Sequence, residues 1–119
     1  MKMNEVTPAM LLDEVHKLQS EFPDAVYEPD YDNWNGPSYG YTVGSAGNGV
    51  GCIVGQAWQR LGVSIEDIEK LERELYERPE GGTIVSVMLS ELGFRDDPSI
   101  EKLRKIQVNQ DLNCKWGKC

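Results

Sequence analysis

The sequence predicts a mainly α-helical (α+β) fold, with four to five short helices around one core and a small β-hairpin. Three observations predict it. Apolar residues recur at helical spacing in five segments of the chain. Glycine or proline follows the first four of these segments, as is common where helices end. Residues 23–49 instead combine turn-forming residues with aromatics, which is typical of a hairpin and a Gly- and aromatic-rich loop.

The first helix is expected over residues 8–21. Thr7 can act as the N-cap and Pro8 suits the first helical position, because proline lacks the N–H that would be unpaired there. Pro23 ends the helix. Its apolar stripe consists of Leu11, Val15, Leu18 and Phe22.

A hairpin is expected next, with residues 25–28 and 39–43 as its two antiparallel strands. The stretch 29–37 between them is rich in proline, aspartate, asparagine and glycine, which favour turns. We therefore expect this stretch to form a long loop.

Two helices are expected after the glycine-rich stretch, over residues 51–61 and 64–78. Gly62 stops the first of them, and Val63 supplies the hydrophobic contact that accompanies a glycine C-cap. Ser64 can cap the second helix. The sequence therefore predicts two helices joined by a short turn.

The fourth helix is expected over residues 83–92, between a Thr83 cap and a stop at Gly93. The run 84–87 is rich in β-branched residues and would also suit a strand. Helix is favoured, because the apolar positions after this run continue the helical spacing.

The last helix is expected to start at Asp97-Pro98 and to end near Gln110. Residues 112–119 show little periodicity and are expected to form a tail. The whole chain, 1–119, is therefore interpreted as a single small domain.

Charge and hydropathy exclude several classes of protein. The 119 residues carry a net charge of −8, which argues against a general nucleic-acid binder. No apolar run is long enough to span a membrane, and no secretory signal opens the chain. The charge is uneven, with −6 over residues 1–40 and +2 over residues 95–119. We expect an acidic, soluble, intracellular domain.

Three cysteines are present, Cys52, Cys114 and Cys119. An odd number without a secretory signal does not indicate a disulfide framework. Cys114 and Cys119 are close in sequence, but no second Cys or His pair accompanies them at zinc-finger spacing. The cluster Asp30-Tyr31-Asp32-Asn33 lacks the glycine and distal glutamate of an EF-hand loop. No metal and no cofactor is predicted.

Cys52 is the one candidate for catalysis. It opens the helix 51–61, and a helix N-terminus favours the thiolate form of a cysteine. The segment also resembles NlpC-family endopeptidases, in which a nucleophilic cysteine opens a helix. His16 is the single histidine that could serve as the base, and it falls on the polar face of its helix. A cysteine-dependent hydrolase and a buried, inert Cys52 therefore remain alternatives.

Two further alternatives concern phosphate and DNA. The glycine-rich stretch 44–51 precedes a helix, as in anion-binding loops, but it matches neither the P-loop nor the dinucleotide motif. The last two helices could form a helix-turn-helix. In that case DNA would be read by Lys102, Arg104, Lys105, Gln107 and Asn109.

The segment 52–63, Cys-Ile-Val-Gly-Gln-Ala-Trp-Gln-Arg-Leu-Gly-Val, resembles a group of small uncharacterised proteins of phages that infect actinobacteria. These proteins carry Cys-Ile/Leu-Val-Gly-x-Ala-x-x-Arg-x-Gly-Val after a Tyr-containing stretch, and Gln-x-x-Gln-Asp further on. Here these are residues 39–43 and 107–111. The resemblance implies a phage origin and a location in the host cytoplasm, but no activity.

We therefore expect a non-enzymatic phage accessory protein that binds a host or defence protein. Aromatic residues are favoured anchors at protein interfaces, and the acidic segment 23–49 holds most of the tyrosines. Alternatively, these aromatics cover the core. The expected contact residues are Tyr27, Glu28, Asp30, Tyr31, Asp32, Trp34, Tyr39 and Tyr41.

Overall fold

The computed structural model describes residues 1–32, 36–38, 41–42, 44–76 and 84–119. Within this part the helices are α1 (Pro8–Glu21), α2 (Ile53–Arg60), α3 (Ile65–Tyr76), α4 (Val85–Glu91) and α5 (Pro98–Asp111), with 3-10 turns η1 (Met3–Glu5) and η2 (Trp116–Lys118). The strands are β1 (Asp30–Asp32), β2 (Gly36–Ser38), β3 (Ser45–Ala46) and β4 (Gly49–Val50). The predicted class, mainly α with a small β-hairpin, is confirmed.

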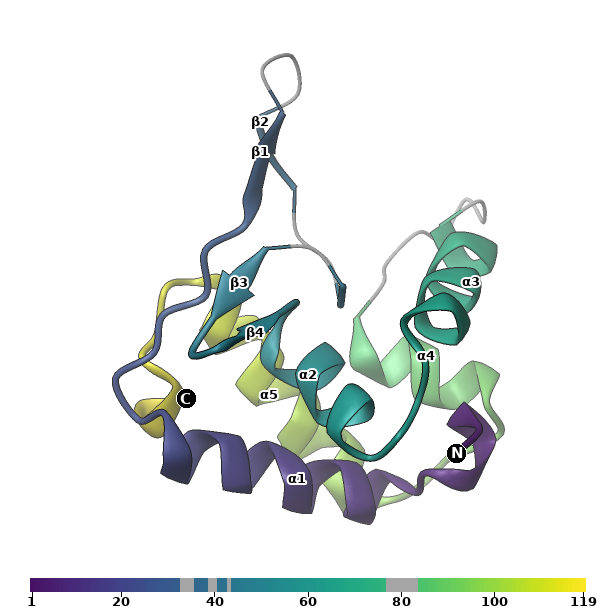
Figure 1. The fold of residues 1–119 in the computed structure, drawn as a ribbon. Coiled ribbons are helices and arrows are strands. Elements are labelled where there is room, and N and C mark those ends of the chain that lie inside the picture. The colour runs from purple at the N-terminus through teal and green to yellow at the C-terminus, as the bar shows by residue number, and fades with distance from the viewer. Residues whose placement is uncertain (33–35, 39–40, 43, 77–83) are drawn as a thin grey trace.

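The helices pack around α2, which lies above α1 and in front of α5 (Figure 1). Its residues Ile53, Val54, Ala57 and Trp58 are all fully buried. Helix α4 packs on α5, and α3 contacts α4. The β1–β2 hairpin stands away from this helical body, whereas β3–β4 lies against it (Figure 1). No helix in the described part of the chain is long and apolar enough to cross a membrane.

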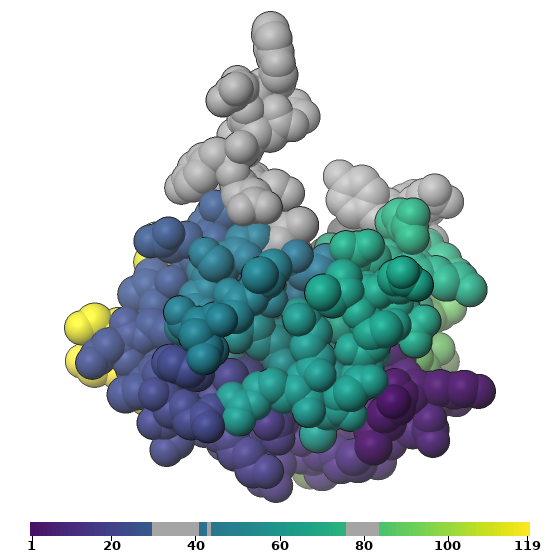
Figure 2. Space-filling view, in the orientation of Figure 1, coloured from purple at the N-terminus to yellow at the C-terminus, as the bar shows by residue number. Residues whose placement is uncertain are grey.

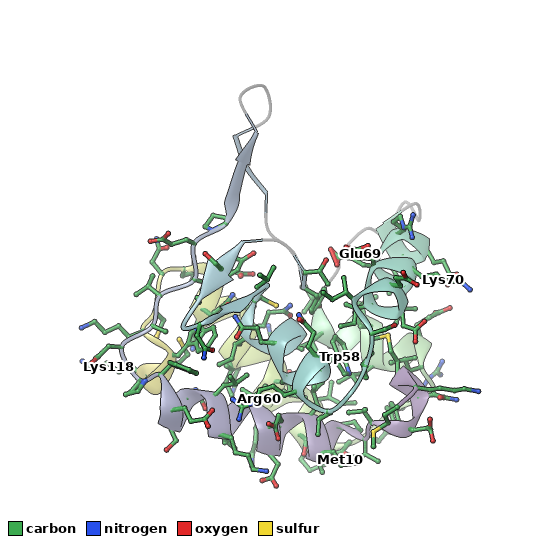
Figure 3. All side chains as sticks on the ribbon, viewed as in Figure 1. Met10, Trp58, Arg60, Glu69, Lys70 and Lys118 are labelled. Atoms are coloured by element: carbon green, nitrogen blue, oxygen red, sulfur yellow. The ribbon has the colours of Figure 1, made fainter. Side chains whose placement is uncertain are left out.

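The local signals that begin α1 act as predicted. The Thr7 hydroxyl accepts a hydrogen bond from the Met10 N–H at 3.2 Å, and Pro8 is the first residue of the helix. Leu11, Val15 and Leu18 are buried along one face of α1. The helix is tied to α2 by Arg60, which lies between the two helices (Figure 3) and pairs with the largely buried Glu14 at 3.0 Å.

The turn between α2 and α3 also forms where predicted. Gly62 has a φ of +92°, a conformation that glycine adopts without strain. The Val63 N–H then bonds to the Trp58 carbonyl at 3.0 Å, and Val63 is buried. The Ser64 hydroxyl accepts from the Asp67 N–H and so caps α3. Beyond this turn, the Met1 amino group donates to the Gly62 carbonyl, and Figure 2 shows the N-terminal residues (purple) against the body there.

The predicted helix after residue 84 is confirmed, since α4 spans Val85–Glu91. The expected cap Thr83 lies outside the described residues. Ile84 takes the N-cap position, and its side chain offers no acceptor to the first turn. Helix α5 begins after Asp97 as predicted, with the Asp97 carboxylate accepting from the Ser99 N–H at 2.9 Å.

The predicted positions of the hairpin strands are wrong. Asp30 pairs with Ser38 and Asp32 with Gly36, so the main hairpin lies within the stretch expected to be its loop. The segment 25–28 contributes only a single bridge, from Glu28 to Ser45. The strands were predicted in segments that contain aromatic residues. In the structure, packing holds these aromatic side chains, and a ladder of strand hydrogen bonds does not.

The second candidate strand, 39–43, is described only at Tyr41 and Thr42, and both lie outside any strand. Tyr41 is buried against Trp58, with ring centroids 5.5 Å apart. Side-chain burial therefore holds this segment in place. A second short hairpin, β3–β4, follows it.

The segment 112–119 packs against the rest of the chain, contrary to the expected tail. Trp116 is fully buried, and its backbone N–H donates to the Ala25 carbonyl at 2.9 Å. The Gly117 N–H donates to the Pro23 carbonyl at 2.9 Å. Gln19 of α1 donates to the Trp116 carbonyl at 2.8 Å. A single buried tryptophan, which carries no periodic signal, therefore anchors this segment.

Candidate functional site

Cys52 is the N-cap of α2, with its Sγ accepting a hydrogen bond from the Gly55 N–H at 3.4 Å. The side chain is buried, with 3% of its surface exposed. Burial raises the pKa of the Cys52 thiol to about 12, more than the backbone hydrogen bonds from the helix start lower it. Of the two alternatives for Cys52, these contacts disfavour the activated thiolate, because desolvation dominates at this position. Cys52 instead matches the other alternative, a small buried cysteine.

Two carboxylates near Cys52 also oppose a thiolate. The charges of Asp111 and Glu72 both raise the pKa of the Cys52 thiol. Burial raises the pKa of Asp111 to about 6 and also raises the pKa of Glu72. The surroundings of Cys52 therefore favour neutral groups, and a nucleophile would need the opposite.

His16 does not complete a catalytic pair. Its side chain is exposed on α1, where Nδ1 lies 2.9 Å from Gln19 Oε1. A general base must come within hydrogen-bonding distance of the thiol that it deprotonates. An exposed imidazole bonded to its own helix and a buried thiol do not form such a pair.

The structure brings the Gln-x-x-Gln-Asp motif to the start of the Cys52 segment. Gln110 is fully buried, and its carboxamide oxygen accepts from the Ile53 N–H at 3.0 Å. Gln107 is also buried, and its oxygen accepts from the Val85 N–H at 2.7 Å. The side chain of Gln107 also hydrogen-bonds the Tyr41 side chain. The two sequence motifs that carry the phage resemblance, 52–63 and 107–111, therefore contact each other in one polar cluster inside the core.

Sequence analysis missed the role of these glutamines. Gln107 was considered only as a DNA-reading residue, and Gln110 only as the end of the last helix. The available signal was their spacing, because Gln107 follows Ile106 and both glutamines continue the buried face that begins at Leu103. Polar residues that continue an apolar stripe indicate buried hydrogen bonds.

The glycine-rich stretch before α2 is tightly packed. A Cβ atom on Gly51 would lie 2.0 Å from the Tyr41 carbonyl oxygen, and a Cβ on Gly55 would lie 1.8 Å from it. The N–H groups of Ile53 and Gly55 are already taken by Gln110 and Cys52. These glycines let the backbone of Tyr41 cross the start of α2, and the crossing leaves that helix start with few free donors for an anion.

Two of the expected contact residues belong to the core. Tyr27 and Tyr41 are each 1% exposed, so the alternative that aromatics cover the core holds for them. They were assigned to a surface because they lie in a polar segment. In the fold, Tyr41 packs on Trp58, and the Tyr27 ring fills the space beside Gly44.

Four of the other expected contact residues, Glu28, Asp30, Tyr31 and Asp32, lie at the root of the projecting hairpin or on its first strand. The Glu28 side chain is exposed. Asp30, Tyr31 and Asp32 form β1, whose backbone is described. Trp34 and Tyr39 lie outside the described residues. Strand β1 therefore stands away from the helical body (Figure 1), whereas Glu28 lies at its root and pairs with Ser45 of β3.

Helix α5 presents only part of the surface that a helix-turn-helix would need, because Lys102 and Lys105 are exposed whereas Gln107 is not. Gln107, one of the expected DNA-reading residues, is buried and bonded to Val85. Arg104 forms an ion pair with Glu101 at 2.6 Å. Asn109 donates to the Cys119 carbonyl. Side chains that read bases must reach out from the recognition helix, and here Gln107 points into the core.

Where the chain is described, no three His, Cys, Asp or Glu side chains come together as a metal site. Comparison of the chain with protein-family models, curated proteins and solved structures found no match. The roles of these residues therefore follow from their contacts in this fold.

Proposed function

We propose that this protein is a small acidic phage accessory protein that binds a host or defence protein in the host cytoplasm, without catalysing a reaction. The β1–β2 hairpin is the proposed contact element. The observation that carries this proposal is the position of the hairpin, which stands away from a closed helical body (Figure 1). An isolated two-stranded hairpin is marginally stable in water, so a projecting one gains from a partner surface.

The charge of the hairpin supports a basic partner surface. Glu28 is exposed at its root, and Asp30 and Asp32 lie on β1. Residues 1–40 carry a net charge of −6. Opposite charge on a partner would speed the encounter and fix the orientation of binding.

The anchors proposed within this surface are Tyr31 and Trp34. Tyrosine and tryptophan account for a large share of interface hot spots. Tyr27 and Tyr41 are not part of the proposed surface, because both are buried in the core. The proposal thus separates aromatics that hold the fold from aromatics that would hold a partner.

The competing enzymatic function lacks support at Cys52. The thiol is buried, with a pKa raised to about 12, and the single histidine is exposed on α1. Cysteine hydrolases need an accessible thiolate beside a base. Binding without catalysis agrees better with these contacts.

The test is affinity capture of the tagged protein from actinobacterial host cells, followed by mass spectrometry and by binding measurements with the purified partner. Two hairpin variants are compared with the wild type, Asp30→Lys/Asp32→Lys and Tyr31→Ala/Trp34→Ala. The charge control is Asp13→Lys/Glu74→Lys, which changes two exposed acids of α1 and α3 by the same amount.

Both hairpin variants are expected to lose the partner, with the melting temperature unchanged. The charge control is expected to keep it. Equal loss of binding in the charge control would assign the effect to net charge and contradict the hairpin as the contact element. A large fall in the melting temperature of the Tyr31→Ala/Trp34→Ala variant would place these aromatics in the core.

A further inference from the structure

Two cysteine side chains converge on one backbone oxygen in the segment after α5. The thiol of Cys114 lies 3.4 Å from the Lys115 carbonyl oxygen, and the thiol of Cys119 lies 3.2 Å from the same atom. The Cys114 and Cys119 side chains also hydrogen-bond each other. Both side chains are partly exposed, whereas Cys52 is buried. The two thiols are therefore neighbours that a small reagent can reach.

We propose that Cys114 and Cys119 form a redox-active pair, which closes to an intramolecular disulfide on reaction with a low-molecular-weight disulfide such as oxidised glutathione. This site is separate from the hairpin and does not depend on the proposed binding function. Intracellular disulfides are mostly transient and serve catalysis or redox sensing. The pair is thus a site of reversible modification.

Backbone and side-chain contacts hold the two cysteines together in the reduced protein. The Cys114 N–H donates to the Asn109 carbonyl at 3.1 Å. The Cys119 N–H donates to the Trp116 carbonyl, and the Cys119 carbonyl accepts from the Asn109 side chain. Trp116, between the two cysteines, is fully buried. Because the fold already brings the thiols together, closing the bridge costs little additional chain entropy.

The two thiols have different roles in the exchange. Burial, and then the hydrogen bond with Cys114, raises the pKa of the Cys119 thiol to about 12. Cys119 therefore keeps its proton at neutral pH. The thiolate is the attacking form, and burial disfavours it at Cys119, so the proposed exchange begins at Cys114.

In the first step the Cys114 thiolate attacks one sulfur of the reagent disulfide. A mixed disulfide forms on Cys114, and one reagent thiolate leaves. In the second step Cys119 passes its proton to that thiolate, and its sulfur attacks Cys114 Sγ. The protein disulfide forms, and the second reagent thiolate leaves and takes from water the proton that Cys114 released when it formed its thiolate. In sum, one reagent disulfide is reduced to two thiols and the two cysteine thiols are oxidised.

The test treats the full chain with oxidised glutathione under native conditions and measures intact mass before and after alkylation with iodoacetamide. The wild type is expected to lose the mass of two hydrogen atoms and both alkylation sites, without retaining glutathione. Cys119→Ser should retain one glutathione on Cys114, because the second thiol is missing. Cys114→Ser should retain little, because burial disfavours the thiolate of Cys119. Cys52→Ser is the matched control and should behave as the wild type.

The wild type should retain at least about tenfold less glutathione than Cys119→Ser, because the second step is intramolecular. Peptide mapping of the oxidised wild type should show the Cys114–Cys119 bridge, and dithiothreitol should restore both thiols. Glutathione retained by the wild type as strongly as by Cys119→Ser would overturn the proposal, as would disulfide-linked dimers as the main product. Peptide mapping needs no variant, so the test does not depend on how the serine variants fold.

Discussion

The carboxamide oxygen of Gln110 accepts a hydrogen bond from the backbone N–H of Ile53 at 3.0 Å, across 57 positions of sequence. Gln107, one turn earlier on α5, does the same for the Val85 N–H. The first N–H groups of a helix have no partner within that helix. A capping side chain usually comes from the residue just before the helix, but here α5 supplies acceptors to the first turns of both α2 and α4.

We expect Gln110→Met to lower the free energy of unfolding by about 1–3 kcal/mol, because the Ile53 N–H would remain buried without an acceptor. The control is Gln59→Met, which removes a hydrogen bond to the Val50 carbonyl at the surface. Its cost should be smaller, because water can replace the lost bond. Urea denaturation measures both variants. Equal losses would show that the Gln110 bond is worth no more than an exposed one.

Gly55→Ala should destabilise the protein by about 1–3 kcal/mol or more, as expected of overpacking. A glycine-to-alanine change within a helix ordinarily stabilises it. At Gly55 the same change should instead lower the stability, because the new Cβ would lie 1.8 Å from the Tyr41 carbonyl oxygen. Gly93→Ala is the comparison, since nothing lies within 4 Å of its Cβ and only its φ of +95° opposes alanine. A stable Gly55→Ala protein would contradict the close crossing at Tyr41.

Asp111 should make the protein less stable as the pH rises. Its pKa is raised by burial from 3.8 to about 6. Below the lower value both the folded and the unfolded chain hold the proton. Between the two values the unfolded chain loses it first, so the free energy of unfolding falls as the pH rises. Above about pH 6 both the folded and the unfolded chain have lost the proton, and the free energy of unfolding falls no further on this account.

Asp111→Asn should therefore match the wild type at pH 3.5 and exceed it at pH 7. The expected gain is about 1 kcal/mol, because partial exposure to solvent reduces the full effect of the shift. Asparagine keeps an oxygen to accept the hydrogen bond from Gln110. Urea denaturation across this pH range measures the difference. A difference that does not change with pH would contradict burial of the Asp111 carboxyl.

Native alkylation should leave Cys52 unmodified. The thiol is buried and its pKa is raised to about 12, so iodoacetamide meets neither an accessible sulfur nor a thiolate at pH 7. Peptide mapping should show modification at Cys114 first, since its side chain is partly exposed. In urea, Cys52 should react as the chain unfolds. Rapid native alkylation of Cys52 that titrates near neutral pH would restore the nucleophile hypothesis.

Local signals were sufficient to predict most of the helices. Thr7, Gly62 and Asp97 act on residues within one turn of themselves, so their effect can be read without the fold. The choice of helix for residues after Ile84 also held, because the apolar spacing continued beyond the β-branched run.

Features that depend on distant contacts were not predictable in the same way. Trp116 is buried by residues 23–25, and Gln110 bonds to α2, so neither role is visible in the neighbouring sequence. The buried state of Cys52 likewise depends on what packs over the start of α2. Tyr41 was assigned to the surface from the polarity of its neighbours, whereas its burial is decided by Trp58.

The root of the β1–β2 hairpin is fixed at two places. In the segment that precedes the hairpin, the Pro23 carbonyl accepts a hydrogen bond from the Gly117 N–H, and the Ala25 carbonyl accepts one from the backbone N–H of Trp116. Further along, Glu28 exchanges two backbone hydrogen bonds with Ser45. The hairpin is therefore attached to the helical body at both of these places and projects from it. A force applied to β1 and β2 would pass through these hydrogen bonds into η2 and β3, so the proposed binding of a partner would also depend on segments outside the contact surface.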